Sequence, residues 1–432
     1  MATAAPAATG NFPWPIDHRV LENGLRVTVV PMPSEGVVAL GVWMDVGSRN
    51  EVDPGRTGFA HFFEHLMFHG TETMSASERE REMLRLGADS NAWTWLDETV
   101  YHEVLPAEGL ERALAIEADR FTALSLTEDG VRREAGAVYG EYRKGQADPD
   151  QLLYEQLQAA AFTVHPYRHD TLGLEADIVA MPSAFAYAST FFDRWYRPEH
   201  AHVLVVGDAD PDAAQAAVER AFGGWKQGDA PPPRMPPVEP EQRAERRVDV
   251  PWSGAGAPRL SLAWKIPAHE AADKDPAALE LAAEMLRAET GDLQRVVVRE
   301  RRLAFDASVW RDATVDPGLF RVDLELRDAA DLATAEAAVR SIVDALAVGP
   351  DPAALESVRT ARTYRTLTSL TDPLTVLELV ANASRRGGDP RALEQWLTSL
   401  RTVTATDMAS AVRTHLTDSH LTVAALVPEG DG

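Results

Sequence analysis

TGFAHFFEHLMFHG, residues 57–70, places ionisable side chains inside a run of apolar residues. An apolar run of this kind is typical of a buried helix. His61 and His65 lie four residues apart and Glu64 lies three residues after His61, so all three side chains project from one side. Ionisable groups are costly to bury without a function. The pattern therefore predicts a zinc site, and the alternative is a pair of core histidines bound to backbone groups.

The order of these residues reverses the common HExxH motif of zinc proteases. In HExxH the glutamate directly follows the first histidine, whereas Glu64 directly precedes His65. Because the residues share one helix face, the reversed order gives a similar arrangement in space. Glu64 is the candidate general base, which takes a proton from a zinc-activated water. The inverted order is itself a catalytic pattern of zinc peptidases.

A catalytic zinc ion needs a third protein ligand and one open coordination position. The chain has no cysteine, so His, Asp or Glu must supply this ligand. The acidic helix predicted for residues 128–145 carries Glu134 and Glu141, seven residues apart on one face. Either could bind zinc while the other orients a ligand or the water. His69, four residues after His65, is a further candidate.

Composition narrows the possible partners. The formal charge of -25 would repel phosphates and disfavours nucleic acid. The charge suits basic peptides or proteins as substrates, although a purely solubilising role explains it equally well. No apolar run approaches the roughly 18 residues that cross a bilayer, so no membrane span is expected.

The N-terminal residues 1–15 are rich in alanine and proline and are predicted to be disordered. They lack the basic start and apolar core of a signal peptide. The segment would suit a mature end left after signal removal, with an initiator Met added. The expected location is the bacterial periplasm if a signal peptide was removed, and otherwise the cytoplasm.

The chain reads as two similar parts joined by the proline-rich segment 226–248, which predicts an extended linker. Residues 181–212 read as a capped helix, a polar turn and a β-branched strand, and residues 403–431 repeat this order. The candidate helix caps are Ser183 in the first part and Thr404 or Thr406 in the second. The similarity predicts a duplicated domain, and the alternative is coincidence between two common helix–strand units.

Strand patterns alternate with long helices in the first part, at residues 25–30, 37–49, 89–96 and 99–105. Because neighbouring strands can pair through short turns, the expected fold class is α+β, with a mainly antiparallel sheet backed by helices in each of two homologous domains. The expected segments are a disordered 1–15, a zinc-binding domain 16–225, a linker 226–248 and a second domain 249–432.

The residues around the motif resemble the inverted-zincin metallopeptidases, the family of pitrilysin, insulin-degrading enzyme and mitochondrial processing peptidase. The resemblance covers both parts of the chain and is strongest over residues 16–225. Besides the His61, Glu64 and His65 triplet, the matching residues are Gly47, Ser48, Arg49, Glu51, Gly58, Ala60, Phe68, Gly70, Thr71, Asn91, Ala92, Thr94, Thr99 and Tyr101.

This resemblance implies a Zn2+ cofactor and a specific ligand set. Glu141 follows His65 at the family's spacing and would be the third ligand beside His61 and His65, with Glu134 behind the metal. It also implies that two such chains, or four such domains in one chain, enclose a chamber. A substrate peptide would pair with an edge strand that contains Asn91, Ala92, Trp93 and Thr94.

The second part departs from the family pattern. Members with a whole site carry an Arg and a Tyr in a pattern like R-E-x-x-G-L-A-Y, in which the Tyr helps to stabilise the oxyanion. Arg299 fits the Arg, but the Gly is missing, the spacing is one residue short and Phe305 replaces the Tyr. Phe305 has no hydroxyl to donate and is expected to be a core residue of an ordinary strand. We therefore expect a heterodimer, in which this chain bears zinc and a homologous partner supplies the Arg/Tyr pair.

The leading functional hypothesis is a zinc-dependent endopeptidase that hydrolyses peptides or unfolded segments. The alternative is a non-catalytic scaffold or a peptide-binding subunit of the same fold. A scaffold would be expected to have lost motif residues, whereas His61, Glu64, His65 and Glu141 are all present.

Overall fold

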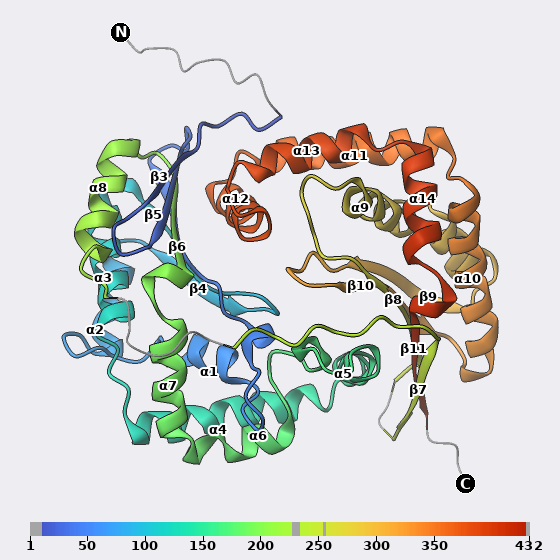
Figure 1. Cartoon of the computed structure of the whole chain (residues 1–432), viewed down its shortest axis with the longest axis horizontal. Helices are drawn as coiled ribbons and strands as arrows, with labels where there is room; N and C mark the ends of the chain where they lie inside the picture. The colour runs from blue at the N-terminus through green and yellow to red at the C-terminus, as the bar shows by residue number, and fades with distance from the viewer. Residues whose placement is uncertain (1–10, 227–233, 254–255, 429–432) are drawn as a thin grey trace. The chain divides into compact units, whose positions relative to one another are not determined.

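The computed structural model describes residues 11–226, 234–253 and 256–428. Contacts between Cα atoms divide the chain into two compact units, each built around one sheet (Figure 1). Unit 1 comprises Met1–Gly140, Asp170–Pro236 and Leu367–Glu394, and unit 2 comprises Glu141–His169, Pro237–Thr366 and Gln395–Gly432.

The sheet of unit 1 has six strands in the order β1-β2-β6-β3-β5-β4. β2 runs parallel to β6, and the other neighbouring pairs are antiparallel. β3 and β6 are central and almost wholly buried, whereas β4 forms an edge. The strands are β1 (Asp17–Val20), β2 (Arg26–Pro31), β3 (Val37–Met44), β4 (Asp89–Thr94), β5 (Thr99–Pro106) and β6 (Ala201–Gly207).

Helices cover both faces of this sheet (Figure 1). α3 (Leu110–Thr122) packs on α8 (Pro211–Phe222), which contacts β2, and α12 (Pro373–Gly387) packs against β3 and β6. α1 (Phe59–Leu66) contacts β4, β5 and α7 (Phe185–Trp195), and α2 (Ala76–Arg85) contacts β4. Shorter elements are α6 (Glu175–Ala180), η1 (Ser48–Asn50), η2 (Ala107–Gly109), η4 (Met181–Ser183) and η5 (Pro198–His200).

The sheet of unit 2 has five strands in the order β7-β11-β8-β10-β9. β7 runs parallel to β11, and the other pairs are antiparallel. Without β1, the strand order in unit 1 is β2-β6-β3-β5-β4, which follows the chain in the same way as the order in unit 2. In each sheet the first two strands of this order form the one parallel pair. This confirms the predicted fold class of two similar α+β domains. The strands are β7 (Arg246–Trp252), β8 (Arg259–Ile266), β9 (Ala304–Arg311), β10 (Gly318–Leu326) and β11 (Leu421–Pro428).

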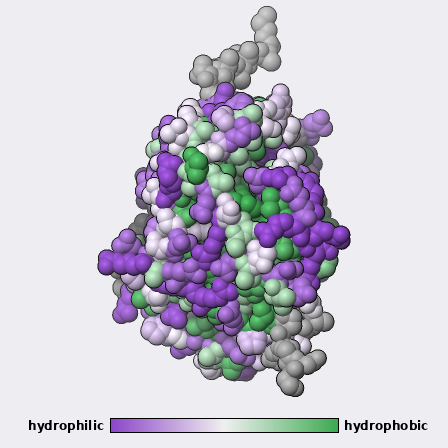
Figure 2. Space-filling view, turned by 90° about the vertical axis from the view of Figure 1, so that its right-hand side faces the viewer, coloured by the Kyte–Doolittle hydropathy of each residue, from purple (hydrophilic) through white to green (hydrophobic). Residues whose placement is uncertain are grey.

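The apolar core of unit 2 lies between its sheet and the helices α9, α10 and α14. The side of the molecule that carries α10 and α14 mixes hydrophilic and apolar residues (Figure 2). The helices are α9 (Lys274–Arg287), the π-helix η6 (Leu293–Glu300), α10 (Leu332–Val348), α11 (Pro352–Ser369), α13 (Ala392–Thr402) and α14 (Ala405–His415), with short turns η3 (Pro166–Arg168), η7 (Ala329–Asp331) and η8 (Asp418–His420).

Each unit includes one helix from the other half of the sequence. α5 (Pro149–Ala161) packs against β7, β8 and β11 of unit 2, whereas α12 packs in unit 1. Both helices start with proline after an aspartate cap, Asp148 or Asp372. The compact units therefore differ from the contiguous segments 16–225 and 249–432, and those boundaries stay a prediction about the sequence repeat.

The start of the described chain is anchored in unit 1. The backbone N–H groups of Asn11 and Phe12 donate to the Glu394 carboxylate at 2.7 and 2.9 Å, and Trp14 Nε1 donates to Leu370 O at 2.9 Å. Residues 11–14, which belong to the segment predicted to be disordered, are thus bound by residues far along the chain. Residues 1–10 of the predicted disordered segment lie outside the described residues.

Part of the predicted linker is bound to unit 2. Residues 237–245, here called the strap, follow residues 227–233, which lie outside the described residues. Glu239 accepts from the backbone N–H groups of residues 163–165 at 2.8, 2.9 and 3.1 Å, and Gln242 Nε2 donates to Leu421 O at 2.8 Å. β7 begins at Arg246, inside the predicted linker 226–248. The side chains of Glu239 and Gln242 therefore hold the strap against unit 2.

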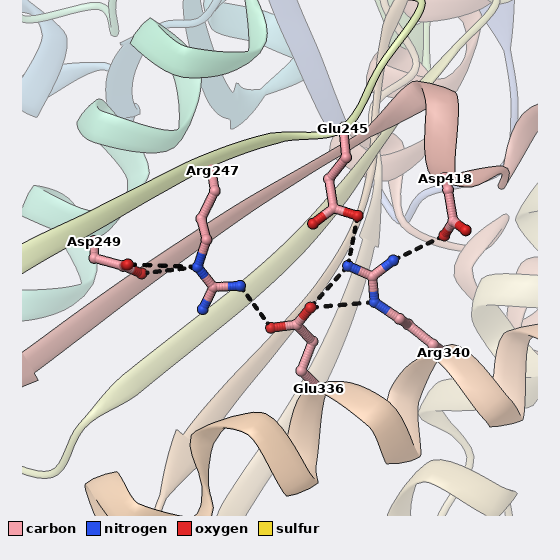
Figure 3. Close-up of polar contacts among 6 residues, drawn as sticks. All are labelled: Glu245, Arg247, Asp249, Glu336, Arg340 and Asp418. Carbon is pink, nitrogen blue, oxygen red and sulfur yellow. Dashed lines mark hydrogen bonds and ion pairs between the residues drawn. The ribbon is translucent and has the colours of Figure 1, made fainter.

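Charged side chains tie the edge strand β7 to its surroundings (Figure 3). Arg247 on β7 reaches Glu336 of α10 at 2.8 Å. Arg340, one turn further along α10, binds Glu336 at 2.7 Å, Glu245 of the strap at 2.9 Å and Asp418 at 2.8 Å. Charged residues on an open sheet edge discourage pairing with other strands.

The structure confirms the predicted helix cap at Thr404 but not the one at Ser183. Thr404 caps α14, because its side chain accepts from the Asp407 N–H while the Asp407 carboxylate binds the Thr404 N–H. Ser183 does not cap α7. It ends the short helix η4 and its hydroxyl donates to Ala180 O, and α7 begins after Ala184.

Candidate metal centre

α1 brings the ionisable residues of the sequence motif to one side of a buried helix. Its apolar residues Phe59, Ala60, Phe62, Phe63 and Leu66 are buried. Ligand atoms of His61, His65 and Glu141 all lie within 4.8 Å of one another. Among the described residues, this is the one His and carboxylate cluster that could hold a metal ion.

Glu141 reaches this cluster because it lies on a long helix, α4 (Glu128–Gly145). The boundary between the two units falls inside this helix, between Gly140 and Glu141. The earlier turns of α4 are attached to α1 through Glu134, seven residues before Glu141. Because α4 is continuous, Glu141 lies on the same helix face as Glu134, two turns further along.

Glu134 binds two histidines of the α1 region. Its carboxylate lies 2.8 Å from His65 Nδ1 and 2.8 Å from His69 Nε2. These hydrogen bonds, first to His65 and then to His69, lower the pKa of Glu134 to about 2. The contact at Nδ1 directs the other ring nitrogen of His65 to the cluster, the usual role of a carboxylate behind a metal-binding histidine. His69, the further candidate ligand, is here a partner of Glu134.

His61 is suited to bind a cation. Burial, followed by the neighbouring His65, lowers the pKa of His61 to about 4, so its imidazole is neutral at pH 7. The rings of His61 and His65 meet edge to face with their centroids 4.7 Å apart. Two neutral imidazoles and one carboxylate form the donor set of a catalytic zinc ion, so the residues present fit the metal.

Thr94 has a role that its sequence position does not reveal. Its hydroxyl donates to Glu64 Oε2 at 2.7 Å. Thr94 is the last residue of β4, so the hydrogen bond joins the edge strand to the candidate general base. The side chains of Ala92 and Ser90 alternate with those of Asn91 and Trp93 and share the Thr94 face.

β4 is an edge strand, as the resemblance implies for the substrate strand. The Trp95 N–H binds Glu98 O across the hairpin at 2.8 Å. Because hydrogen-bonded and free pairs alternate along antiparallel strands, the N–H of Ala92 faces the free edge. The Asn91 side chain accepts from this N–H at 2.9 Å. Trp93 points to the other face, where its ring meets Trp43 and His102.

Two further residues support α1, and the sequence marked both only as family matches. Glu51 accepts from the backbone N–H groups of Gly58 and Ala60, each at 2.8 Å. The Tyr101 hydroxyl donates to Phe63 O at 3.2 Å and lies 2.8 Å from the Tyr196 hydroxyl. No local spacing rule predicts these contacts, because the partners come from separate elements.

Phe305 lies on β9, as the strand pattern predicts, but its predicted burial is wrong. Its side chain is 51% exposed, and the Arg327 guanidinium lies 4.3 Å from the ring centroid. β9 is an edge strand, which explains the exposure. Arg299, the other residue of this pattern, is exposed on η6.

In the part of the chain that the structure describes, no helix is long and apolar enough to cross a membrane.

Comparisons with known proteins find relatives for both halves of the chain. Residues 26–174 match the family model "Insulinase (Peptidase family M16)", and residues 188–362 match "Peptidase M16 inactive domain". The zinc protease PqqE of Helicobacter pylori is 33% identical over 294 residues, which are 66% of this chain and 64% of the relative. The zinc protease YmxG of Bacillus subtilis is 29% identical over 211 residues, 49% of this chain and 51% of the relative. The matches thus span about half to two thirds of these relatives.

Solved structures share the fold over nearly the whole chain. A protease from Helicobacter pylori superposes with a TM-score of 0.91 and 26% identity, covering 96% of this chain and all of that chain. A peptidase M16 inactive domain from Pseudomonas fluorescens superposes with a TM-score of 0.83 at 18% identity and covers 96% of this chain and 98% of that chain. At 18% identity the second likeness concerns the fold alone.

Proposed function

The chain belongs to peptidase family M16, and we propose that it is a zinc-dependent endopeptidase that hydrolyses peptides or unfolded segments. The observation that carries the proposal is the meeting of His61, His65 and Glu141 within 4.8 Å, with Glu64 on the same helix as the two histidines. This donor set has the composition of a catalytic zinc site.

His61, His65 and Glu141 would hold Zn2+, and Glu134 would orient His65 through its Nδ1 atom. When bound, zinc supplies Lewis-acid activation of the attacking water and the peptide carbonyl. Glu64 takes the proton from this water and delivers it to the leaving amine. Thr94 donates to one oxygen of Glu64 and so helps to orient the carboxylate for proton transfer.

The substrate would bind as an added strand on β4, at Asn91, Ala92, Trp93 and Thr94. The free edge offers backbone groups, which tolerate varied side chains. An incoming peptide carbonyl would replace the Asn91 side chain as the acceptor of the Ala92 N–H. A peptide on this strand would lie beside Glu64, because Thr94 links the two.

A homologous partner subunit would supply the Arg/Tyr pair. Phe305 is exposed but has no hydroxyl to stabilise an oxyanion. Loss of one such donor costs on the order of 100-fold or more in rate. The test compares the purified chain alone with the chain mixed with the similar-length product of a neighbouring gene. Full activity of the lone chain would refute the heterodimer.

The direct test of the function is Glu64→Gln, with Glu128→Gln on the exposed first turn of α4 as the matched control. We expect about one zinc per chain in the parent protein, in Glu64→Gln and in Glu128→Gln. Hydrolysis of quenched peptides should fall by about 100- to 10,000-fold in Glu64→Gln only, because the general base is lost.

The alternative is a scaffold or a peptide-binding subunit of the same fold. A scaffold predicts substoichiometric zinc and no cleavage that depends on Glu64. A peptide-binding subunit predicts peptide affinity that Glu64→Gln leaves intact, without hydrolysis in the presence of any partner. Either result would contradict the endopeptidase proposal.

A further inference from the structure

The N-terminus of α1 has no capping side chain of its own. The helix is only eight residues long, and its first N–H groups have no partners within the helix. The residue at the cap position is Gly58, which has a φ of 83° and no side chain to accept from these N–H groups. The first helical residues, Phe59 and Ala60, are fully buried. Water therefore cannot replace a capping side chain without opening the core.

Glu51, which lies outside the helix, accepts hydrogen bonds from these N–H groups. It lies seven residues before Gly58 and is 4% exposed. One carboxylate oxygen accepts from the Gly58 N–H and the other from the Ala60 N–H, each at 2.8 Å. His61 is the next residue after Ala60, so the cap lies directly before the first candidate ligand.

The backbone of Glu51 is held by the substrate-binding hairpin. Glu51 directly follows the short helix η1. The Ser48 and Arg49 N–H groups of this helix donate to Trp95 O at 3.3 Å and to Leu96 O at 2.8 Å. Trp95 and Leu96 directly follow β4. Gly47 permits this approach, because a Cβ atom there would lie 2.3 Å from Trp95 O. One carboxylate thus connects the end of the edge strand to the start of α1.

We infer that Glu51 is a positioning residue for the metal centre. It sets the axial position of α1 relative to β4, and so places His61, His65 and Glu64 against the strand where substrate would bind. The inference rests on the proposed function, because it assigns Glu51 a role in zinc binding rather than in stability alone. It predicts that changing the cap alters metal affinity at temperatures where the protein stays folded.

The test uses the full chain and zinc alone, with affinity measured by competition against a chelator well below the melting temperature. The variants are Glu51→Gln, which keeps one acceptor oxygen, Glu51→Asp, which keeps the carboxyl group but shortens the reach, and Glu51→Ala. We expect zinc affinity to fall about 10- to 100-fold, the usual effect of removing a group that orients metal ligands, and to fall most in Glu51→Ala. If Glu51→Ala does not fold, the zinc affinities of Glu51→Gln and Glu51→Asp still test the inference.

The matched control is Asp210→Asn. Asp210 also caps a helix of unit 1, because its carboxylate accepts from the Ala213 N–H at the start of α8 at 2.9 Å. This variant should lose thermal stability without losing zinc affinity. Zinc affinity within twofold of the parent in Glu51→Gln and Glu51→Asp would overturn the inference. Absence of stoichiometric zinc in the parent protein would instead overturn the proposed function, so the two failures are distinguishable.

Discussion

At the residue scale, a hydroxyl at the end of β4 helps to orient Glu64. The Thr94 hydroxyl donates to Glu64 Oε2 at 2.7 Å, and Thr94 itself is buried at the end of β4. A glutamate that rotates freely would spend less time aligned with the attacking water. Orientation of catalytic groups is a large part of enzymatic rate enhancement.

Thr94→Val removes this hydroxyl while keeping the β-branched shape. We expect kcat for peptide hydrolysis to fall by about tenfold, because a hydrogen bond to a charged acceptor contributes about 1.5–3 kcal/mol. Zinc content should stay near that of the parent protein, since the Thr94 hydroxyl donates to Glu64, which is not a candidate metal ligand. Thr94→Ser should recover most of the rate. An unchanged kcat in Thr94→Val would show that Glu64 is oriented by other groups.

At the element scale, the strap shows how one carboxylate can hold an extended segment. Glu239 accepts from three consecutive backbone N–H groups, at Thr163, Val164 and His165, and lies 3.3 Å from Lys265 Nζ. Burial alone would raise the pKa of Glu239, but these N–H groups and Lys265 outweigh burial and lower the pKa to about 2.

The sign of the pH effect follows from this lowered pKa. Because the folded-state pKa lies below the ordinary value of 4.5, Glu239 stabilises the fold above pH 4.5, and this contribution is lost as the pH falls towards about 2. Chemical denaturation should show Glu239→Gln less stable than the parent at pH 7, with the difference vanishing near pH 2. Glu241→Gln, two residues along the strap at an exposed position, should match the parent at every pH.

The corresponding helices α7 and α14 offer a second prediction at this scale. Thr404 makes a reciprocal cap with Asp407, whereas Ser183 makes no cap. Thr404→Ala should therefore lower the free energy of unfolding by about 1 kcal/mol. Ser183→Ala should change it by less than about 0.5 kcal/mol, as is usual for a surface position. Equal effects in denaturant titrations would contradict the assignment of the caps.

At the scale of the whole molecule, the two units are built from interleaved parts of the chain. α12 comes from the second half of the sequence but packs on the sheet of unit 1. Arg385, in its last turn, binds Asp97 at 3.0 Å and Glu98 at 2.9 Å. Both acids lie in the loop between β4 and β5, and all three side chains are buried. A distant helix therefore fixes the hairpin that carries the proposed substrate strand.

Arg385→Ala should be strongly destabilising. It removes the Arg385 cation from Asp97 and Glu98, both buried, and breaking a buried ion pair costs about 3–5 kcal/mol. We also expect a raised KM for peptides, because the hairpin that ends β4 loses its anchor. Arg391→Ala, which removes an exposed ion pair with Asp389, is the control and should have little effect. A loss of stability with no change in KM would show that the hairpin keeps its position without Arg385.

The sequence by itself determined the features that depend on local spacing. His61, Glu64 and His65 share a helix face because of their spacing, and Glu134 and Glu141 do so for the same reason. The repeated helix–strand pattern likewise predicted two similar α+β domains. Thr404 was one of two candidate caps, Thr404 and Thr406, because a capping pattern lies within four residues, and the structure shows that Thr404 is the cap.

Only the tertiary structure decided which distant surfaces meet. Glu51 caps α1, Thr94 holds Glu64 and α12 packs on β3 and β6, although no spacing rule links these partners. Phe305 could be assigned to a strand but not to an edge, because edge position depends on the strand order of the whole sheet. The physical reason is the same in each case. Helix and strand periodicity is set by the residues themselves, whereas burial and long-range hydrogen bonds are set by the packing of elements far apart in the chain.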